Sequence, residues 1–476
     1  MPNNITKEEL FLESANSLDG INSIDDFDVW FENYYKNHKY SVELIPLNKL
    51  NGWDVDPTSG NIKHSTGKFY SIEGLKVKTS FGKTNYWEQP IINQPEIGIL
   101  GFLTKTFNGL LHFLVQAKME PGNVNSLQIS PTVQATKSNY TQVHGGLKTR
   151  YLEYFLDNHK NNIFLDQLQS EQGSRFYMKR NRNMIINVKE SEDIELHESF
   201  FWLTLGQILE IVKRDNIINM DSRTVLSGVQ YLNIENINNE QITQKEASTF
   251  SEELYISSST FGFGATHNFE KIMSWITTLK TEIETEIRKI PLNQLTSWSN
   301  NGNVISNENK TFFSIVGVSV TAGDREVTKW NQPLLNSLDG GVHCFFVSKI
   351  SGILHFLVQA KSEPGNLDLI ELAPTIQCSL ANYSSHTNYP HYIDLLDQIP
   401  SENIHFDTMQ SEEGGRFYHD QNRYVIAEVD SAMVREIKPN YKWMTLGQIK
   451  ELIRFNNYFN IEARGLLSCL KVTKPL

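Results

Sequence analysis

Alternating apolar and polar residues mark the clearest strand in this chain. Period two along residues 111–118 (LHFLVQAK) places a histidine, a glutamine and a lysine on one face, and mostly apolar side chains on the other. The same eight letters return at residues 354–361, and β-branched runs at 184–188 and 424–429 predict further strands. Strand signals therefore outnumber helix signals.

Helices are predicted around these strands. Thr204 and Gln207 have the spacing of a capping box, in which the threonine accepts from the N3 amide and the glutamine reaches back, and Thr445 and Gln448 repeat it. The balance of elements predicts the α+β class, with a mixed or antiparallel sheet flanked by helices. The predicted helices cover residues 28–38, 149–157, 204–214, 272–287 and 445–456.

The chain is a tandem duplication. Residues 109–123 (GLLHFLVQAKMEPGN) and 352–366 (GILHFLVQAKSEPGN) share 13 of 15 residues at a displacement of 243, and QSEQGSRFY at 169–177 returns as QSEEGGRFY at 410–418. A unit of about 200 residues has the size of a single globular domain and argues against a solenoid of small repeats. The predicted division is an N-terminal arm or short helix (1–26), a first repeat (27–235), a loop-like linker (236–270) and a second repeat (271–476).

Composition narrows the class of protein. The 476 residues carry a net charge of −12 without a Lys/Arg-rich run, which argues against nucleic acid as a partner. No apolar run is long enough to span a membrane, and the start lacks the features of a signal peptide, so the cytoplasm is the expected compartment. The three cysteines are far apart and are interpreted as small buried residues.

The polar face of the repeated strand is the first candidate for chemistry. It reads His112, Gln116, Lys118 and then Glu120, with the same four residue types in the second copy. Charges on a buried sheet face need partners, so the stripe is either solvated or lines a ligand cavity. Both copies keep all four polar residues while neighbouring positions differ, which favours the cavity.

The motif Gln-Ser-Glu-x-Gly-x-Arg-Phe-Tyr is the second candidate. Glu171 with Arg175, and Glu412 with Arg416, are read either as ion pairs or as an arginine on a diphosphate beside an acid or base. The tryptophans are read as core residues more readily than as base-stacking platforms. The chain has no dinucleotide fingerprint, P-loop or zinc-protease motif, so any chemistry is expected to need neither metal nor cofactor.

At QAK-x-EPGN, PT-x-Q, NY-[ST] and QSE-[QE]-G-x-RFY the chain resembles the NDP-hexose 2,3-dehydratases, over both repeats. The resemblance implies two tandem Nudix-like domains, although the metal-binding Nudix box is absent. It also implies loss of water across C2 and C3 of dTDP-4-keto-6-deoxy-glucose, which needs an acid, a base and an oxyanion donor. A homodimer and coupling to a 3-ketoreductase are expected with it. The alternatives are a non-catalytic nucleotide-sugar binding or scaffold protein of the same pathway, and a structural protein whose polar stripes are solvated.

Candidate roles follow from this chemistry. Lysines are assigned to the enolate oxygen, glutamates to the base, and a tyrosine or His144 to protonation of the leaving hydroxyl. Which repeat catalyses stays open. The basic set Lys179-Arg180-Asn181-Arg182 of the first, aligned with His419-Asp420-Gln421-Asn422 of the second, suits a diphosphate, but Arg325 could serve the same purpose in the second. The catalytic candidates are Lys118, Glu120, Tyr140, His144, Glu171, Lys361 and Glu363. The substrate-binding candidates are Trp53, Trp87, Gln116, Gln134, Asn139, Arg150, Tyr151, Arg175, Tyr177, Arg182, Trp298, Arg325, Trp330, Gln359, Gln377, Asn382, Tyr383, Arg416 and Tyr418.

Overall fold

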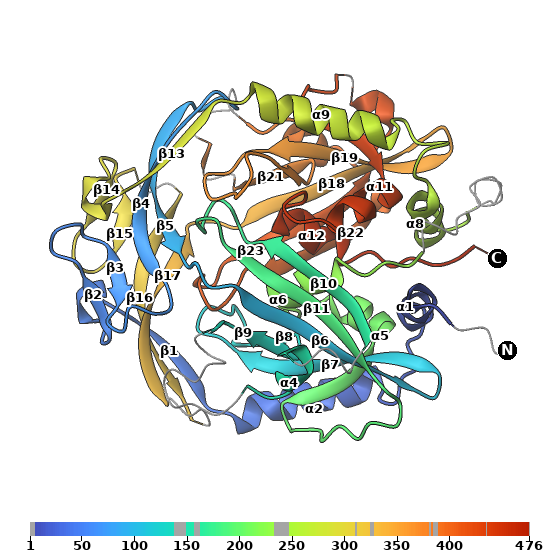
Figure 1. Ribbon diagram of the computed structural model, residues 1–476, viewed down its shortest axis with the longest axis horizontal. Coiled ribbons are helices and arrows are strands. Elements are labelled where there is room, and N and C mark those ends of the chain that lie inside the picture. Colours follow the sequence, from blue (N-terminus) through green and yellow to red (C-terminus); the bar gives the residue numbers. More distant parts are fainter. Residues whose placement is uncertain are drawn as a thin grey trace.

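The computed structural model describes residues 5–137, 149–156, 162–232, 247–309, 312–323, 328–379, 382–383, 389–434 and 436–475. They form two similar α+β halves, which confirms the predicted class (Figure 1). The helices of the first half are α1 (Lys7–Ala15), α2 (Ile24–Asn37), α4 (Glu153–Leu156), α5 (Leu205–Ile211) and α6 (Met220–Leu226). Those of the second are α8 (Phe250–Ser259), α9 (Phe269–Glu282), α10 (Ile393–Leu396), α11 (Leu446–Ile453) and α12 (Ile461–Leu467).

Each half contains one large mixed sheet. In the first, the strands are β6 (Gly98–Phe107), β7 (Leu110–Met119), β8 (Leu127–Ser130), β9 (Val133–Ala135), β10 (Asn162–Ser170), β11 (Arg180–Val188) and β12 (Phe200–Thr204). The second has β18 (Gly341–Ile350), β19 (Ile353–Lys361), β20 (Glu371–Ala373), β21 (Ile376–Ser379), β22 (Ile404–Ser411), β23 (Gln421–Glu428) and β24 (Tyr441–Thr445). One parallel pair, β6 with β11 or β18 with β23, makes each sheet mixed, as predicted.

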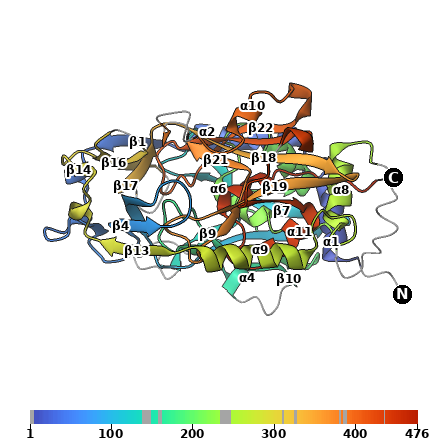
Figure 2. The ribbon, with the colours of Figure 1, turned by 90° about the horizontal axis from the view of Figure 1, so that it is seen from above.

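Two small sheets exchange a strand between the halves. The first half supplies β1 (Tyr40–Ile45), β2 (Trp53–Val55), β3 (Ile62–His64), β4 (Ser71–Thr79) and β5 (Tyr86–Asn93). The second supplies β13 (Thr285–Ile290), β14 (Trp298–Asn300), β15 (Ile305–Asn307), β16 (Phe313–Ala322) and β17 (Lys329–Ser337). Strand β1 pairs with β16 of the second half, and β13 pairs with β4 of the first, both antiparallel. Figures 1 and 2 show these sheets together at one end of the molecule.

Helices α1 and α8 occupy equivalent places in the two halves. Ser14 of α1 donates to the Leu111 carbonyl at 2.6 Å, and Ser257 of α8 donates to the Leu354 carbonyl at 2.6 Å. The stretch 236–270, predicted as a loop-like linker, therefore contains a helix that packs into the second half. The predicted helix 272–287 also ends early, at Glu282, because the chain then extends into β13.

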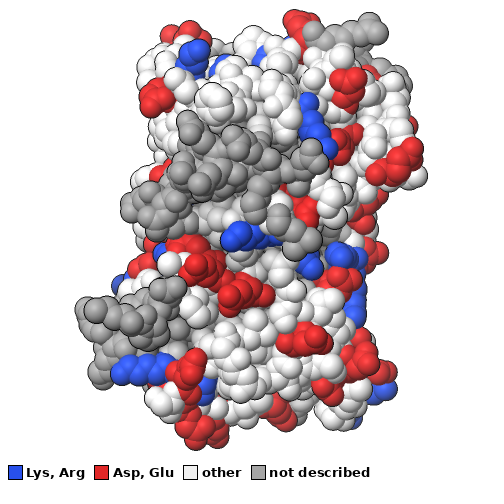
Figure 3. Space-filling view, turned by 90° about the vertical axis from the view of Figure 1, so that its right-hand side faces the viewer, with Lys and Arg blue, Asp and Glu red and all other residues white. Residues whose placement is uncertain are grey.

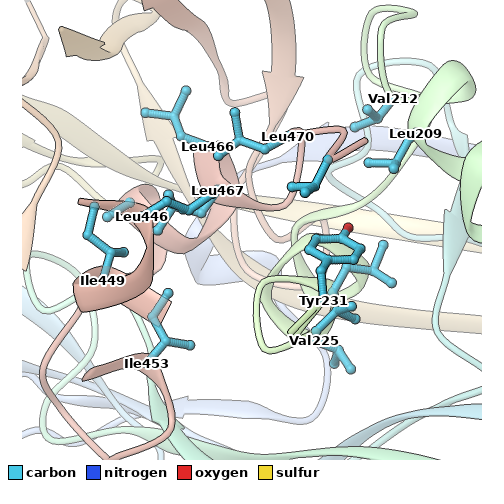
Figure 4. Packing of buried hydrophobic residues seen from close by; sticks show 14 of the residues in the cluster. Leu209, Val212, Val225, Tyr231, Leu446, Ile449, Ile453, Leu466, Leu467 and Leu470 are labelled. Carbon is cyan, nitrogen blue, oxygen red and sulfur yellow. The ribbon is translucent and has the colours of Figure 1, made fainter. Parts of the chain in front are cut away.

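The largest core cluster spans both halves. Helix α6 of the first half packs against α12 of the second, and Figure 4 shows apolar side chains of this cluster from both halves, among them Leu209, Val225, Leu446 and Leu466. Both predicted capping boxes are present, since Thr204 and Thr445 accept from the amides of Gln207 and Gln448. Each fully buried leucine or isoleucine contributes about 1.5–3 kcal/mol. This shared core joins the repeats into one packed body.

The surface matches the acidic composition. Figure 3 shows the face on the right-hand side of Figure 1. On that face, lysine and arginine form small patches among acidic ones, without a broad basic area. Among the residues that the structure describes, no helix is long and apolar enough to cross a membrane.

Candidate active site

The two Glu-Pro-Gly-Asn turns, at residues 120–123 and 363–366, each contact a loop from the other half. The Gly122 amide donates to the Gly414 carbonyl at 2.7 Å, and the His419 amide donates to the Gly122 carbonyl at 2.8 Å. A Cβ at Gly122 would lie 1.4 Å from the Phe417 carbonyl oxygen, so only glycine permits this approach. The second turn repeats the arrangement with Gly365, Gly173, Met178 and Phe176. Both candidate sites are therefore built from both repeats.

The first cluster surrounds the end of β7. Lys118 Nζ lies 3.6 Å from Glu120 Oε1, and Gln134 Nε2 donates to the same oxygen at 3.1 Å. Asn219, which caps the start of α6, donates to Gln134 Oε1 at 3.0 Å. The Lys118 ammonium and the Gln134 amide both contact the Glu120 carboxylate, and these contacts orient Glu120 for proton abstraction.

The second cluster repeats these four residues at the end of β19. Lys361 Nζ lies 3.4 Å from Glu363 Oε1, and Gln377 Nε2 donates to that oxygen at 3.1 Å. Asn460 at the start of α12 donates to Gln377 Oε1 at 2.7 Å. Of the predicted residues, the structure brings Lys118, Glu120 and Gln134 together in one cluster, and Lys361, Glu363 and Gln377 together in the other.

Three further carboxylates crowd the first cluster. Burial, with Glu413 and Glu171 next in importance, raises the pKa of Asp221 well above its ordinary value. Burial and Glu413 raise the pKa of Glu171 to about 7, although its side chain accepts from Asn181 at 2.6 Å. Burial also raises the pKa of Glu413, which comes from the second half. Burial and mutual repulsion therefore both favour the protonated forms of these acids.

The second cluster has its own buried acids. Burial, together with Glu363, raises the pKa of Glu462 well above its ordinary value. Burial and Asp420 raise the pKa of Glu412 to about 8, and its Oε2 accepts from Gln172 Nε2 of the first half at 2.8 Å. Buried carboxyl groups with raised pKa values thus lie in both clusters.

Several positions distinguish the clusters, among them Asp221 in the first, which corresponds to Glu462 in the second. Glu413 in the loop that completes the first cluster corresponds to Gln172 in the loop that completes the second, and Gly415 corresponds to Ser174. The strands fix the alignment of a further pair of residues. The Gly98 amide donates to Asn181 and the Gly341 amide donates to Asn422, so these two asparagines are equivalent. Lys179 therefore matches Asp420, and the sequence-based alignment of Lys179 with His419 was wrong by one residue. Arg182 accordingly has a counterpart, Arg423.

The motif arginines stack on aromatic rings across the halves. Arg416 lies 4.3 Å from the centroid of the Tyr70 ring and donates to Gln94 Oε1 at 3.1 Å. Arg175 lies 4.3 Å from the centroid of the Phe313 ring, and the carboxylates acting on it most are Asp420 and Glu363. Arg175 therefore faces the acids of the second half and not primarily Glu171 of its own motif.

The histidines of the polar stripe are structural. His112 is 1% exposed, and its ring bonds the Leu110 carbonyl at 2.8 Å and the Ile21 amide at 3.0 Å. His355 makes the same contacts in the second half. Gln116, further along the stripe, accepts from Ser130 at 3.4 Å, and Gln359 is half-buried at the matching position. The stripe is thus neither a solvated face nor a uniform cavity wall.

Several predicted substrate-binding residues lie in the small sheets. The indole of Trp53 donates to the Asn331 carbonyl at 2.8 Å and that of Trp298 to the Glu88 carbonyl at 3.0 Å, so both tie one half to the other. Four further predicted substrate-binding residues pack in the smaller apolar clusters of these sheets: Trp87, Tyr177, Trp330 and Tyr418. Substrate binding by these six residues stays a prediction.

Other predicted residues make contacts on the large sheets. Tyr151 donates to the Glu195 carbonyl at 2.6 Å, and Arg182 forms a bidentate pair with Asp166. Arg150 contacts His197, and Tyr383, whose pKa burial raises to about 12, packs beside Tyr389 next to Asn382. Asn139, Tyr140, His144 and Arg325 lie outside the described residues.

Sequence reasoning missed the helix-borne members of both clusters. Asn219 with Asp221, and Asn460 with Glu462, lie at the starts of α6 and α12. A signal for them exists, because an asparagine followed two residues later by an acid stands at these equivalent places in the two repeats. Glu413 carries no such signal, since its counterpart is a glutamine.

Two composite clusters of lysine, carboxylates and amides define an acid–base site suited to a carbonyl-bearing polar substrate. The chain matches the family described as NDP-hexose 2,3-dehydratase over residues 24–229 and 269–470, and it belongs to that family.

Similar proteins agree along nearly the whole length. A dTDP-4-dehydro-6-deoxy-alpha-D-glucopyranose 2,3-dehydratase of Saccharopolyspora spinosa is 39% identical over 466 residues, covering 97% of this chain and 94% of the relative. Enzymes of the same name from Amycolatopsis orientalis and Streptomyces violaceoruber are each 40% identical, covering 96% and 94% of this chain and 92% and 96% of the relatives.

Proposed function

We propose that this chain removes water across C2 and C3 of dTDP-4-dehydro-6-deoxy-glucose and releases a 3,4-diketo-2,6-dideoxy sugar nucleotide. The observation that carries the proposal is the presence, in a chain about 40% identical to enzymes of that name, of a paired lysine and glutamate at the end of the repeated strand.

The residues supply what this reaction requires. The C4 ketone acidifies the C3 hydrogen, so a carboxylate such as Glu120 removes that proton and leaves an enolate. The Lys118 ammonium, 3.6 Å from Glu120, is placed to neutralise the enolate oxygen. Departure of the C2 hydroxyl with a proton from an acid gives an enol, which tautomerises to the diketone. The net change is the loss of one water, without oxidation or reduction.

Further features belong to the same proposal. We expect Nudix-like halves with bounds near 27–235 and 271–476, a homodimer, a cytoplasmic location and functional coupling to a 3-ketoreductase. The coupling follows from the product, because a vicinal diketone is reactive and its reduction at C3 would draw the elimination forward.

The test is mass spectrometry of the purified protein with dTDP-4-dehydro-6-deoxy-glucose, a 3-ketoreductase and NADPH in deuterated water. A 2,6-dideoxy product with solvent deuterium at C2 is expected, because tautomerisation takes a proton from solvent. Binding without loss of water would instead support a non-catalytic nucleotide-sugar carrier.

A further inference from the structure

We infer that Glu413, contributed by the second half, is the proton donor to the leaving C2 hydroxyl in the first cluster. This inference rests on the proposed dehydration and assigns the acid that the reaction needs. It also locates that step in the first cluster, which combines Lys118 and Glu120 of one repeat with a carboxyl group of the other.

The first observation is the position of Glu413 beside Glu120. A Cβ built on Gly415 would lie 3.1 Å from Glu413 Oε1 and 3.5 Å from Glu120 Oε1, so both carboxyl oxygens lie within 3.5 Å of one point. Apart from Gly415 and its chain neighbours, the third nearest heavy atom also belongs to Glu413. Because Gly415 has no side chain, no Cβ lies beside these two carboxyl oxygens.

The second observation is the geometry of the substrate. In the gluco configuration, the C3 hydrogen and the C2 oxygen lie on the same face of the sugar ring and on adjacent carbons. A base and an acid held side by side can therefore serve both atoms from one face. Glu120 is oriented by Lys118 and Gln134 as the base, and the Glu413 carboxyl oxygen that lies near it at Gly415 is assigned as the acid.

The third observation is the difference between the repeats. The loop that completes the second cluster has Gln172 in place of Glu413 and Ser174 in place of Gly415. Gln172 is committed to Glu412, to which it donates at 2.8 Å, and an amide cannot act as the acid. The second cluster thus lacks a carboxyl group at the position of Glu413 and a glycine beside it.

The surroundings of Glu413 suit a group that is protonated before the reaction. Its pKa is raised by burial, opposed by Arg416, and raised again by Glu120. The titratable and charged groups that face it come from several elements. They are Lys118 near the end of β7, Glu120 just after that strand, Glu171 and Lys179 beside β10 and β11, Asp221 on α6, and Arg416 on its own loop. Like-charged neighbours at this density favour retention of a proton.

The step balances without a further reactant. The enolate oxygen electrons re-form the C4 carbonyl, the π electrons of the C3–C4 double bond form the C2–C3 double bond, and the C2–O bond breaks. The departing oxygen takes the Glu413 proton and leaves as water. The Glu413 carboxylate then recovers a proton from the C3 hydroxyl as the enol tautomerises. C2 takes up the proton held by Glu120, after its exchange with solvent, and Glu120 is again a carboxylate.

The experiment compares wild type with Glu413→Gln, Glu413→Asp and, as a matched control at an exposed position of the same half, Glu402→Gln. Each protein is incubated with dTDP-4-dehydro-6-deoxy-glucose in deuterated water. Two rates are measured, which are deuterium uptake at C3 of recovered substrate and formation of the species lighter by water. Melting temperature and dTDP binding by calorimetry verify the fold.

Glu413→Gln is expected to lower the rate of water loss by about 10²–10⁴-fold and to retain deuterium exchange at C3. In wild type the rate should fall at high pH as the acid ionises, and this fall should be absent in Glu413→Gln. Glu413→Asp should recover part of the rate, whereas a purely structural role would favour the isosteric glutamine. Water loss by Glu413→Gln within about threefold of wild type, or loss of C3 exchange together with water loss, overturns the assignment. Wild type that neither exchanges C3 hydrogen nor loses water overturns the proposed function as well.

Discussion

Replacing Gly122 with alanine should separate the two halves of the first cluster. The new Cβ would lie 1.4 Å from the Phe417 carbonyl oxygen, far inside van der Waals contact, so the loop carrying Glu413 must withdraw. Withdrawal breaks the backbone bonds of 2.7 Å to Gly414 and 2.8 Å from His419. Two backbone bonds lost from a buried contact cost about 2–4 kcal/mol.

The melting temperature converts this cost into a measurement. Unfolding entropy of about 2 cal/mol/K per residue gives roughly 1 kcal/mol/K for 476 residues, so Gly122→Ala should lower the midpoint by about 2–4 °C. The rate of water loss should fall by a larger factor than the fraction of folded protein, because Glu413 moves away from Glu120. Gly365→Ala meets the Phe176 carbonyl at 1.7 Å and should cost similar stability while reducing the rate less. An unchanged melting temperature and rate in Gly122→Ala would refute this account of the contact.

Three other changes test separate parts of the structure. Glu120→Gln should lower the dehydration rate by about 10²-fold or more and Glu363→Gln by much less, and equal losses in steady-state assays would contradict the assignment to the first cluster. Arg464→Met removes a fully buried guanidinium and its bonds to Thr224 and the Phe459 carbonyl, so the melting temperature should drop by about 3–5 °C; no drop would show that other bonds replace them. Glu412, with a pKa of about 8 against an ordinary 4.5, binds its proton more tightly when folded, so stability should decline as pH rises from about 4.5 to 8. Glu412→Gln should flatten that slope in urea titrations at several pH values, and an unchanged slope would assign it to another group.

Local patterns predicted much of the fold. The strand at 111–118 and its copy could be predicted because period two is a property of the strand itself. The capping boxes at Thr204 and Thr445 were predictable for the same reason, since all their atoms lie within four residues. The grouping of lysine and glutamate in each cluster followed from that strand.

Contacts between the repeats could not be predicted in this way. Strand β1 has the same alternation whether it pairs within its own half or with β16, so the exchange leaves no local trace. Glu413 entered no prediction because its partners, Glu120 and Asp221, are nearly 300 and 200 residues away in the sequence. Asn219 and Asn460 were missed for a simpler reason, since a helix cap accounts for an asparagine without any role in a site.

The exchanged strands bear on how such a chain arose. A single copy of the repeat would leave the edge of β4 or β16 without the strand that now covers it, and would carry a turn without the loop that docks on it. An ancestral single-repeat protein of this architecture would therefore have been an intertwined pair of identical subunits with two equal sites. Duplication and fusion of the gene would have freed each copy to change alone, and a glutamate in one copy at the position of a glutamine in the other is a difference that no symmetric dimer could acquire.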